Sequence, residues 1–556
     1  MTHCHHRPMM AISRQVACYN SCRLFGRNAI LQTVDAMSGG RISRRALMGG
    51  AAAIPLLELI PRGLWGFSSG KRQVTIRADS EIGLVRPELH GHFAEHLGAC
   101  VYGGIWVGRD SAIPNVNGYR KLTVEYLREL GVPVLRWPGG CFADDYHWHD
   151  GVGPAANRPK SVNLHWGGYV EDNSFGTDEF IGFCRQIGAE PYICGNVGSG
   201  SPEELRDWIE YCNFPSGSTI SEERIRNGHT QPHRVRYWGV GNENWGCGGD
   251  MTAREYAKLY RRFAVFAPTF GGLKPFLIAC GPNRNDASWS RDFMDSVPPR
   301  HLPQGFAMHY YAEGKDNPAA YTPADMAAQL TTFGDIERAV IEQRALLDGY
   351  DSGRNVALIV DEWGVHDRVV PSEEKTHGRL WQECTMRSAL AIALGLNLFN
   401  RQADKLYMCN LTQTVNVRAP LLQTDGPEGQ RCIRTSVYHV FTLFKSHRSK
   451  TSVHVESDDP TSTRFSVSAS RQDRDVVISL VNASADEDMP IDCKLAGERP
   501  GSASAQILHS DDLNAFNTFD SPETIAPRSH PVRVEGSNIQ LDLPRLSVIS
   551  ITVRLV

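Results

Sequence analysis

Eight apolar runs alternate with helix-like segments between residues 82 and 447, and this alternation constrains the fold more than any other feature of the sequence. Each run is apolar throughout, as expected for strands that are buried on both faces. Strands separated by amphipathic segments form parallel sheets. We therefore predict an α/β fold, a (β/α)8 TIM barrel. The predicted strands are 89–95, 134–138, 191–196, 237–242, 275–281, 305–311, 357–362 and 406–413.

A doubly wound open sheet is the alternative arrangement for such a series. That fold commonly carries a glycine-rich dinucleotide-binding motif after a strand, and none follows any of the eight runs. The polar motifs instead fall at the carboxyl ends of the predicted strands, where barrel enzymes place their active sites. This placement favours the closed barrel.

The pattern changes after residue 447, where short alternating strands separated by turn residues replace the strand–helix units. We predict an all-β sandwich over 448–556, after a barrel domain over 82–447. The early strand within 71–81 precedes the barrel and needs a sheet to pair with, so we expect it to join the sandwich. A structural support for the barrel and a carbohydrate-binding module are both compatible with this domain.

Two of the predicted barrel strands lead into a glutamate that is followed closely by a tryptophan and a glycine. The run that starts at Tyr237 leads into Asn242-Glu243, and the run that starts at Ala357 leads into Glu362. In a barrel both carboxylates would face each other across the mouth. One ionised carboxylate can attack a sugar carbon while a protonated one supplies a proton to the leaving group, which is the chemistry of a retaining glycosidase. A structural ion pair at each strand end is the alternative, and the repetition of the pattern disfavours it.

From about residue 84 to the C-terminus the sequence resembles the α-L-arabinofuranosidases of glycoside hydrolase family 51. The resemblance implies that Glu243 is the general acid/base and Glu362 the nucleophile, in a reaction that needs no cofactor or metal. The motifs that carry it are F-A-E-H-L-G at 93–98, R-W-P-G-G at 136–140, G-N-E at 241–243, D-E-W at 361–363 and N-L-T-Q at 410–413.

The same resemblance implies a set of sugar-binding residues at the strand ends. These are Glu95, Arg136, Asn242, Tyr311 and Gln413. Asn242 is expected to bond the sugar 2-hydroxyl, and Tyr311 to donate a hydrogen bond to the nucleophile. Barrel packing for Tyr311, an ion pair with a glutamate for Arg136, and a loop-capping amide for Gln413 are the structural alternatives.

Cys141 departs from the family pattern, because many members carry a sugar-binding asparagine there. A thiol is a weak hydrogen-bonding group, so we expect the backbone at this position to serve the substrate. Other cysteines, among them Cys194, Cys280 and Cys409, lie in apolar runs and are predicted to be buried free thiols. The Cys141 departure leaves fine specificity open.

The predicted function is that of a retaining, exo-acting α-L-arabinofuranosidase acting on terminal residues of arabinan, arabinoxylan or their oligosaccharides. An endoglucanase or other glycosidase on the same framework is the alternative. A non-catalytic sugar-binding barrel is disfavoured because both glutamates are present.

The H-x-x-E-H pattern at 92–96 is shared with some zinc peptidases. That chemistry needs a helix, and the glycines that follow this segment disfavour one. Family members tend to form oligomers, so the resemblance implies a homo-oligomer.

Charge and the N-terminal segment bear on partners and location. With 58 basic and 62 acidic side chains the formal net charge is −4, so we predict no nucleic-acid partner.

Arg44-Arg45 precedes an apolar run that ends at Ile60 and is too short to span a bilayer. This resembles a twin-arginine signal. We therefore predict a disordered extension and signal peptide over 1–70, bacterial export to the periplasm or the medium, and a mature form without membrane attachment.

Overall fold

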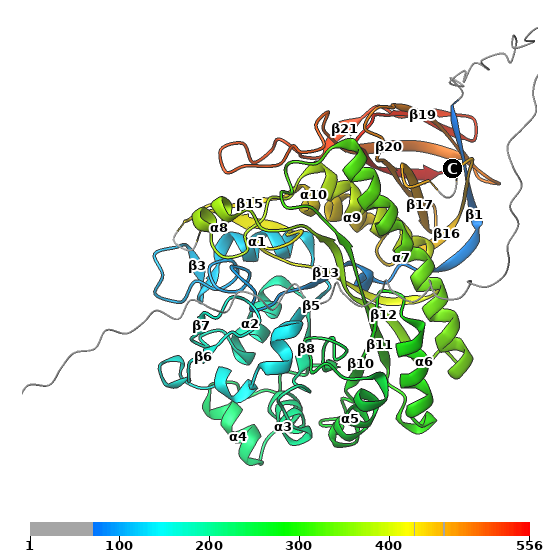
Figure 1. Cartoon of the computed structure of the whole chain (residues 1–556). Helices are drawn as coiled ribbons and strands as arrows, with labels where there is room; N and C mark the ends of the chain where they lie inside the picture. The colour runs from blue at the N-terminus through cyan, green and yellow to red at the C-terminus, as the bar shows by residue number, and fades with distance from the viewer. Residues whose placement is uncertain (1–70, 427–428, 460–461) are drawn as a thin grey trace, which may run out of the picture. The chain divides into compact units, whose positions relative to one another are not determined.

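The computed structural model describes residues 71–426, 429–459 and 462–556, and its centre is a closed barrel of eight parallel strands (Figure 1). The predicted (β/α)8 barrel is confirmed, and the strands close in the order in which they occur along the chain. They are β2 (Gly91–Phe93), β5 (Val134–Trp137), β8 (Glu190–Gly195), β9 (Tyr237–Val240), β10 (Phe276–Asn283), β11 (Gly305–Glu313), β12 (Ala357–His366) and β13 (Leu406–Thr412).

One side chain from each of seven barrel strands contributes to an apolar cluster inside the barrel. Because the interior is filled, the barrel is a packed core, and a substrate can enter only at its mouth. The cluster consists of Val134, Tyr192, Tyr237, Ile278, Ala307, Ile359 and Met408.

Helices between the strands pack their apolar sides against the outside of the barrel. Several begin at a capping hydroxyl that accepts a backbone N–H, such as Ser201 before α3 and Thr252 before α5. Two short helices, α4 (Thr219–Arg226) and α8 (Pro371–His377), were not predicted. The others are α1 (Lys121–Leu130), α2 (Thr177–Ile187), α3 (Pro202–Asn213), α5 (Ala253–Phe266), α6 (Ala287–Ser296), α7 (Pro323–Tyr350), α9 (Met386–Arg401) and α10 (Ser436–Phe444).

Within the described part of the chain, no helix is both long enough and apolar enough to cross a bilayer.

Nine C-terminal strands and the N-terminal strand β1 (Arg72–Leu84) form one ten-stranded sheet around a second apolar core. Strand β1 lies between β16 (Thr451–Ser457), its antiparallel partner, and β19 (Met489–Leu495), its parallel partner. Figure 1 shows β1 in blue among the orange and red strands. The remaining strands are β17 (Phe465–Gln472), β18 (Asp475–Asn482), β20 (Pro500–His509), β21 (Arg528–His530), β22 (Arg533–Glu535), β23 (Asn538–Leu543) and β24 (Ser547–Leu555).

Small polar side chains join this sheet to the barrel helix α9. Asn400 Nδ2 donates to Ser468 Oγ at 3.0 Å, and Ser468 Oγ donates to Asn397 Oδ1 at 2.7 Å. All three side chains are buried, so the bonds satisfy polar groups that burial would otherwise leave unpaired. The sheet therefore braces the helix that follows strand β12.

Candidate active site

The polar side chains singled out in the sequence gather at the carboxyl ends of the barrel strands, and hydrogen bonds link most of them to one another. Glu95 follows β2, Arg136 lies on β5, Asn242 and Glu243 follow β9, Tyr311 lies on β11, Glu362 on β12, and Gln413 follows β13.

Glu362 is held as an ionised carboxylate. Arg136 Nη1 donates to its Oε1 at 2.7 Å, and Tyr311 Oη donates to its Oε2 at 2.5 Å. Burial by itself raises the pKa of Glu362, but the charges of His309 and Arg136 and the two hydrogen bonds outweigh it and lower this pKa to about 2. The side chain therefore carries a negative charge at neutral pH, as a carboxylate nucleophile must.

Arg136 connects Glu362 with the neighbouring polar side chains. Its Nη2 donates to Asn242 Oδ1 at 2.5 Å, and its Nε lies 3.3 Å from Asp361 Oδ2. Burial lowers the pKa of Arg136, yet the charges of Asp361 and Glu362 raise it well above its ordinary value. Among the described residues its ion pairs are with these two carboxylates, and not with Glu95 or Glu243.

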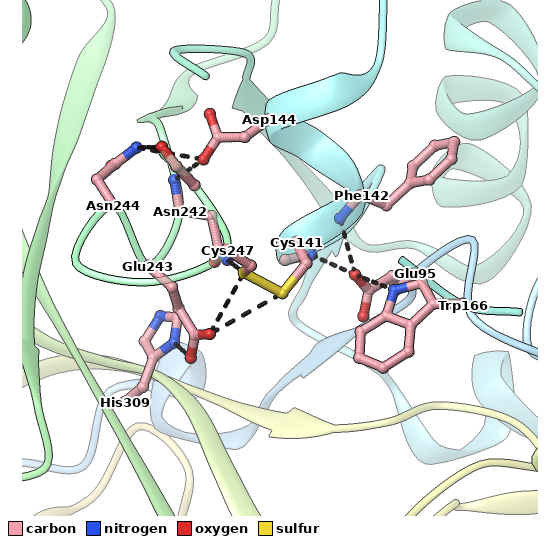
Figure 2. The surroundings of a disulfide bond; sticks show 12 residues. Glu95, Cys141, Phe142, Asp144, Trp166, Asn242, Glu243, Asn244, Cys247 and His309 are labelled. Carbon is pink, nitrogen blue, oxygen red and sulfur yellow. Dashed lines mark hydrogen bonds and ion pairs between the residues drawn. A yellow bond between two sulfur atoms is a disulfide. The ribbon is translucent and has the colours of Figure 1, made fainter. Parts of the chain in front are cut away.

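Glu243 offers a carboxylate in a different setting (Figure 2). Its Oε1 lies 2.9 Å from His309 Nδ1, and its Oε2 lies 3.6 Å from Cys247 Sγ. Its side chain is 19% exposed, compared with 7% for Glu362. One carboxylate oxygen of Glu243 lies within 4.8 Å of one from Glu362, so the two groups can flank one sugar carbon.

His309 is a site residue that the sequence analysis did not single out. It pairs in register with Glu362 on the adjacent strand, and its Nδ1 also lies 3.7 Å from Glu362 Oε1. Burial lowers the pKa of His309, but the charges of Glu362 and Glu243 raise it overall. The sequence could have indicated His309 by its position two residues before Tyr311, because alternate residues of a strand point to the same face.

Glu95 is the centre of a second polar group in the site. Its Oε2 accepts from Gln413 Nε2 at 3.0 Å, while its Oε1 accepts from the backbone N–H of Gly140 at 2.9 Å and from Trp166 Nε1 at 3.1 Å. Trp166 comes from the loop between β6 (Ser161–Val162) and β7 (Val170–Glu171). Burial, followed by the nearby carboxylate charge, raises the pKa of Glu95. Such a hydrogen-bonded carboxylate is suited to hold a sugar hydroxyl.

Cys141 differs from expectation, because it is not a free thiol. It forms a disulfide with Cys247, 106 residues further along the chain. Nothing in the spacing indicated this pair, because only the folded barrel brings the loops after β5 and β9 together. Cys194, Cys280 and Cys409 are buried and free, in agreement with the sequence-based prediction.

Asp144 is a second residue that the sequence analysis missed. Its Oδ2 accepts from the backbone N–H of Asn242 at 2.8 Å and from Asn244 Nδ2 at 3.3 Å. Its Oδ1 accepts from the backbone N–H groups of Val197 at 2.6 Å and Gly198 at 3.0 Å. Asp144 thus ties the loops after three strands together on both sides of the Glu243 position.

The zinc-peptidase interpretation of 92–96 does not fit the structure. His92 lies on strand β2 and His96 in the loop that follows, where its Nδ1 is 3.2 Å from Glu171 Oε2. The pattern requires a helix that presents both histidines on one face, and this segment is not helical.

The comparisons with known proteins agree with this geometry. Residues 126–329 match the family model described as alpha-L-arabinofuranosidase 1 domain, and residues 361–547 match the alpha-L-arabinofuranosidase C-terminal domain. An intracellular exo-alpha-L-arabinofuranosidase from Bacteroides ovatus is 38% identical over 493 residues, which cover 86% of this chain and 95% of that protein. The chain belongs to the α-L-arabinofuranosidase family.

Solved structures of family 51 arabinofuranosidases are also similar to this chain. The crystal structure of the enzyme from Xanthomonas axonopodis pv. citri has a TM-score of 0.83 and 36% identity, and the match covers 87% of this chain and 100% of that one. The Thermotoga maritima enzyme, solved as an arabinose complex, has a TM-score of 0.77 and 28% identity, with 87% and 100% covered. As an arabinofuranosidase, the protein is a glycoside hydrolase of arabinose-containing glycans. These relatives favour the predicted activity over the endoglucanase alternative.

The prediction of export is wrong. The Bacteroides ovatus arabinofuranosidase, similar over nearly its whole length, is described as intracellular. Arg44-Arg45 and the apolar run after it lie outside the described residues. Two adjacent arginines before a short apolar run form a small pattern that also arises by chance, which explains why the inference failed.

A methyl group at Gly140 is expected to displace the carboxylate of Glu362. A Cβ at Gly140 would lie 2.6 Å from Glu362 Oε1, and real Cβ contacts are essentially never this short. Because a misplacement of about 1 Å can cost roughly a hundredfold in rate, we expect Gly140→Ala to lower kcat on 4-nitrophenyl α-L-arabinofuranoside by about that factor. Steady-state kinetics measure this effect.

Gly349→Ala is the matched control for that substitution. Gly349 lies in helix α7, and a Cβ there meets no atom within 4 Å. We expect unchanged kcat for this variant. Unchanged activity of Gly140→Ala would show that the loop can move away without disturbing Glu362.

Proposed function

We propose that this arabinofuranosidase works with net retention, with Glu362 as the nucleophile and Glu243 as the general acid/base. The distance of at most 4.8 Å between the nearest carboxylate oxygens carries the proposal. Retaining glycosidases hold their carboxyl groups about 5–5.5 Å apart, whereas inverting enzymes leave about 6.5–9.5 Å for a water molecule. The separation in this site supports the retaining arrangement.

The first step joins the sugar to the enzyme. A carboxylate oxygen of Glu362 attacks the anomeric carbon while protonated Glu243 gives its proton to the glycosidic oxygen, and the leaving group departs as an alcohol. Arg136 and Tyr311 orient the attacking carboxylate through hydrogen bonds to its two oxygens. Glu243 is more exposed than Glu362, which suits the side that faces the leaving group.

The second step releases the sugar. Glu243, now a carboxylate, takes a proton from water as the water oxygen attacks the anomeric carbon, and Glu362 leaves as a carboxylate. His309 lies within 4 Å of both carboxylates and helps to hold them side by side through both steps.

We propose terminal α-L-arabinofuranosyl groups of arabinan, arabinoxylan or their oligosaccharides as substrates. The Bacteroides ovatus relative, described as an exo-enzyme, supports removal from chain ends. The hydrogen-bonded cluster around Glu95 supports recognition of one sugar by several hydroxyl contacts.

The test of the acid/base assignment is Glu243→Ala with and without sodium azide. On an activated aryl arabinofuranoside, azide should restore turnover and yield an arabinofuranosyl azide of retained (α) configuration, because a small anion can attack the glycosyl-enzyme without a general base. Proton NMR of the product identifies the anomer. An azide of inverted configuration, or no rescue at all, would reject the assignment.

A further inference from the structure

The Cys141–Cys247 disulfide lies beside the proposed acid/base residue. It joins the loop after β5 to the loop after β9, and Cys247 comes four residues after Glu243 (Figure 2). The nine other cysteines within the described residues are all free and buried. Cys247 is exposed, so this pair is the place where a reductant from solvent can react.

The two oxygens of the Glu243 carboxylate have different neighbours. Oε1 lies 2.9 Å from His309 Nδ1, whereas the contacts of Oε2 among the described residues are with Cys247 Sγ at 3.6 Å and Cys141 Sγ at 4.0 Å. A disulfide carries no proton and cannot donate to that oxygen. Oε2 is therefore free to carry the proton that the glycosidic oxygen receives.

The backbone at Glu243 needs to be held in place. Its φ of 43° lies in the left-handed region, which is unfavourable for a residue with a side chain. Gly246 N and Gly248 N donate to the carbonyl of Glu243 at 2.7 and 3.2 Å, and Asp144 anchors the preceding residue. The disulfide adds the covalent link that attaches this loop to the loop after β5, two strands away around the barrel.

We propose that the Cys141–Cys247 disulfide positions Glu243 for proton donation, and that reduction of the disulfide weakens acid catalysis. The inference rests on the proposed role of Glu243. A dithiol reductant supplies two electrons and two protons, becomes a cyclic disulfide, and leaves two thiols on the enzyme. Each thiol can then donate to Glu243 Oε2, and the loop loses its covalent link.

The experiment compares two leaving groups before and after reduction. Phenyl α-L-arabinofuranoside needs a proton on its leaving oxygen, whereas a dinitrophenyl arabinofuranoside has a leaving group that departs without one. After treatment with dithiothreitol, we expect kcat/KM on the phenyl substrate to fall by about tenfold, a part of the usual contribution of a general acid, with little change on the dinitrophenyl substrate. Mass spectrometry after alkylation confirms that two thiols have formed.

The double variant Cys141→Ser/Cys247→Ser is a second test, which does not depend on a reductant. This variant should show the same selective loss and no further response to dithiothreitol, even if the native bond resists reduction. Equal losses on both substrates, or no loss in the serine variant, would overturn the proposal. If azide rescues Glu243→Ala while the serine variant keeps full activity on the phenyl substrate, only the role of the disulfide fails. If azide rescue is absent, the proposed function itself fails.

Discussion

Replacement of Glu362 with alanine is expected to lower kcat by about 10⁴-fold or more, because the variant loses the carboxylate that we propose as the nucleophile. KM should change much less, since Arg136, Glu95 and Gln413 keep their places around the sugar. The measurement is steady-state hydrolysis of 4-nitrophenyl α-L-arabinofuranoside. Circular dichroism and thermal unfolding should show that the variant is folded.

Glu313→Ala is the matched control. Glu313 lies at the carboxyl end of strand β11, pairs with Arg284 at 3.4 Å and has a side chain that is 71% exposed. We expect wild-type kinetics for it. A variant without Glu362 that kept a tenth of the wild-type kcat would show that another group attacks the sugar.

Replacement of Arg136 with methionine should affect both stability and catalysis. The guanidinium is 1% exposed and neutralises two buried carboxylates, Asp361 and Glu362. Removal of one partner of a buried ion pair leaves an uncompensated charge, so the free energy of unfolding should fall by about 3–5 kcal/mol. Chemical denaturation with urea measures this change.

The same variant should alter the pH profile. Arg136 is one of the charges that hold the pKa of Glu362 at about 2, so its loss raises that pKa. Only the ionised carboxylate attacks, and therefore activity at acidic pH should be lost at a higher pH than in the wild type. In a plot of kcat/KM against pH, the acid limb of the variant should therefore lie at higher pH than that of the wild type.

Arg254→Met is the control for both effects. Arg254 pairs with Asp292 on the surface at 2.9 Å, and its side chain is 65% exposed. Such exposed pairs contribute little, so stability and the pH profile should not change measurably. If Arg136→Met has a wild-type acid limb, His309 and Tyr311 suffice to keep Glu362 ionised.

The strand–helix pattern could be predicted from the sequence because the strands are continuous apolar runs, whereas the helices between them place apolar residues on one face only. A run such as β5 is buried on both faces, so its composition identifies it as a strand of a parallel sheet that is covered on both sides. The short strand β2 was placed too long, at 89–95 instead of Gly91–Phe93, since a 3-10 helix at Pro87–His90 provides its first apolar residues.

What the sequence by itself determined was the barrel and the position of Glu243 and Glu362 toward the carboxyl ends of strands, because periodic burial and strand-end position are local properties of the chain. Only the tertiary structure decided which groups touch those glutamates. His309 reaches both carboxylates because β11 and β12 are adjacent, and Cys141 meets Cys247 because β5 and β9 end on the same side of the barrel. Such contacts depend on distances across the closed sheet, which no spacing along the chain records.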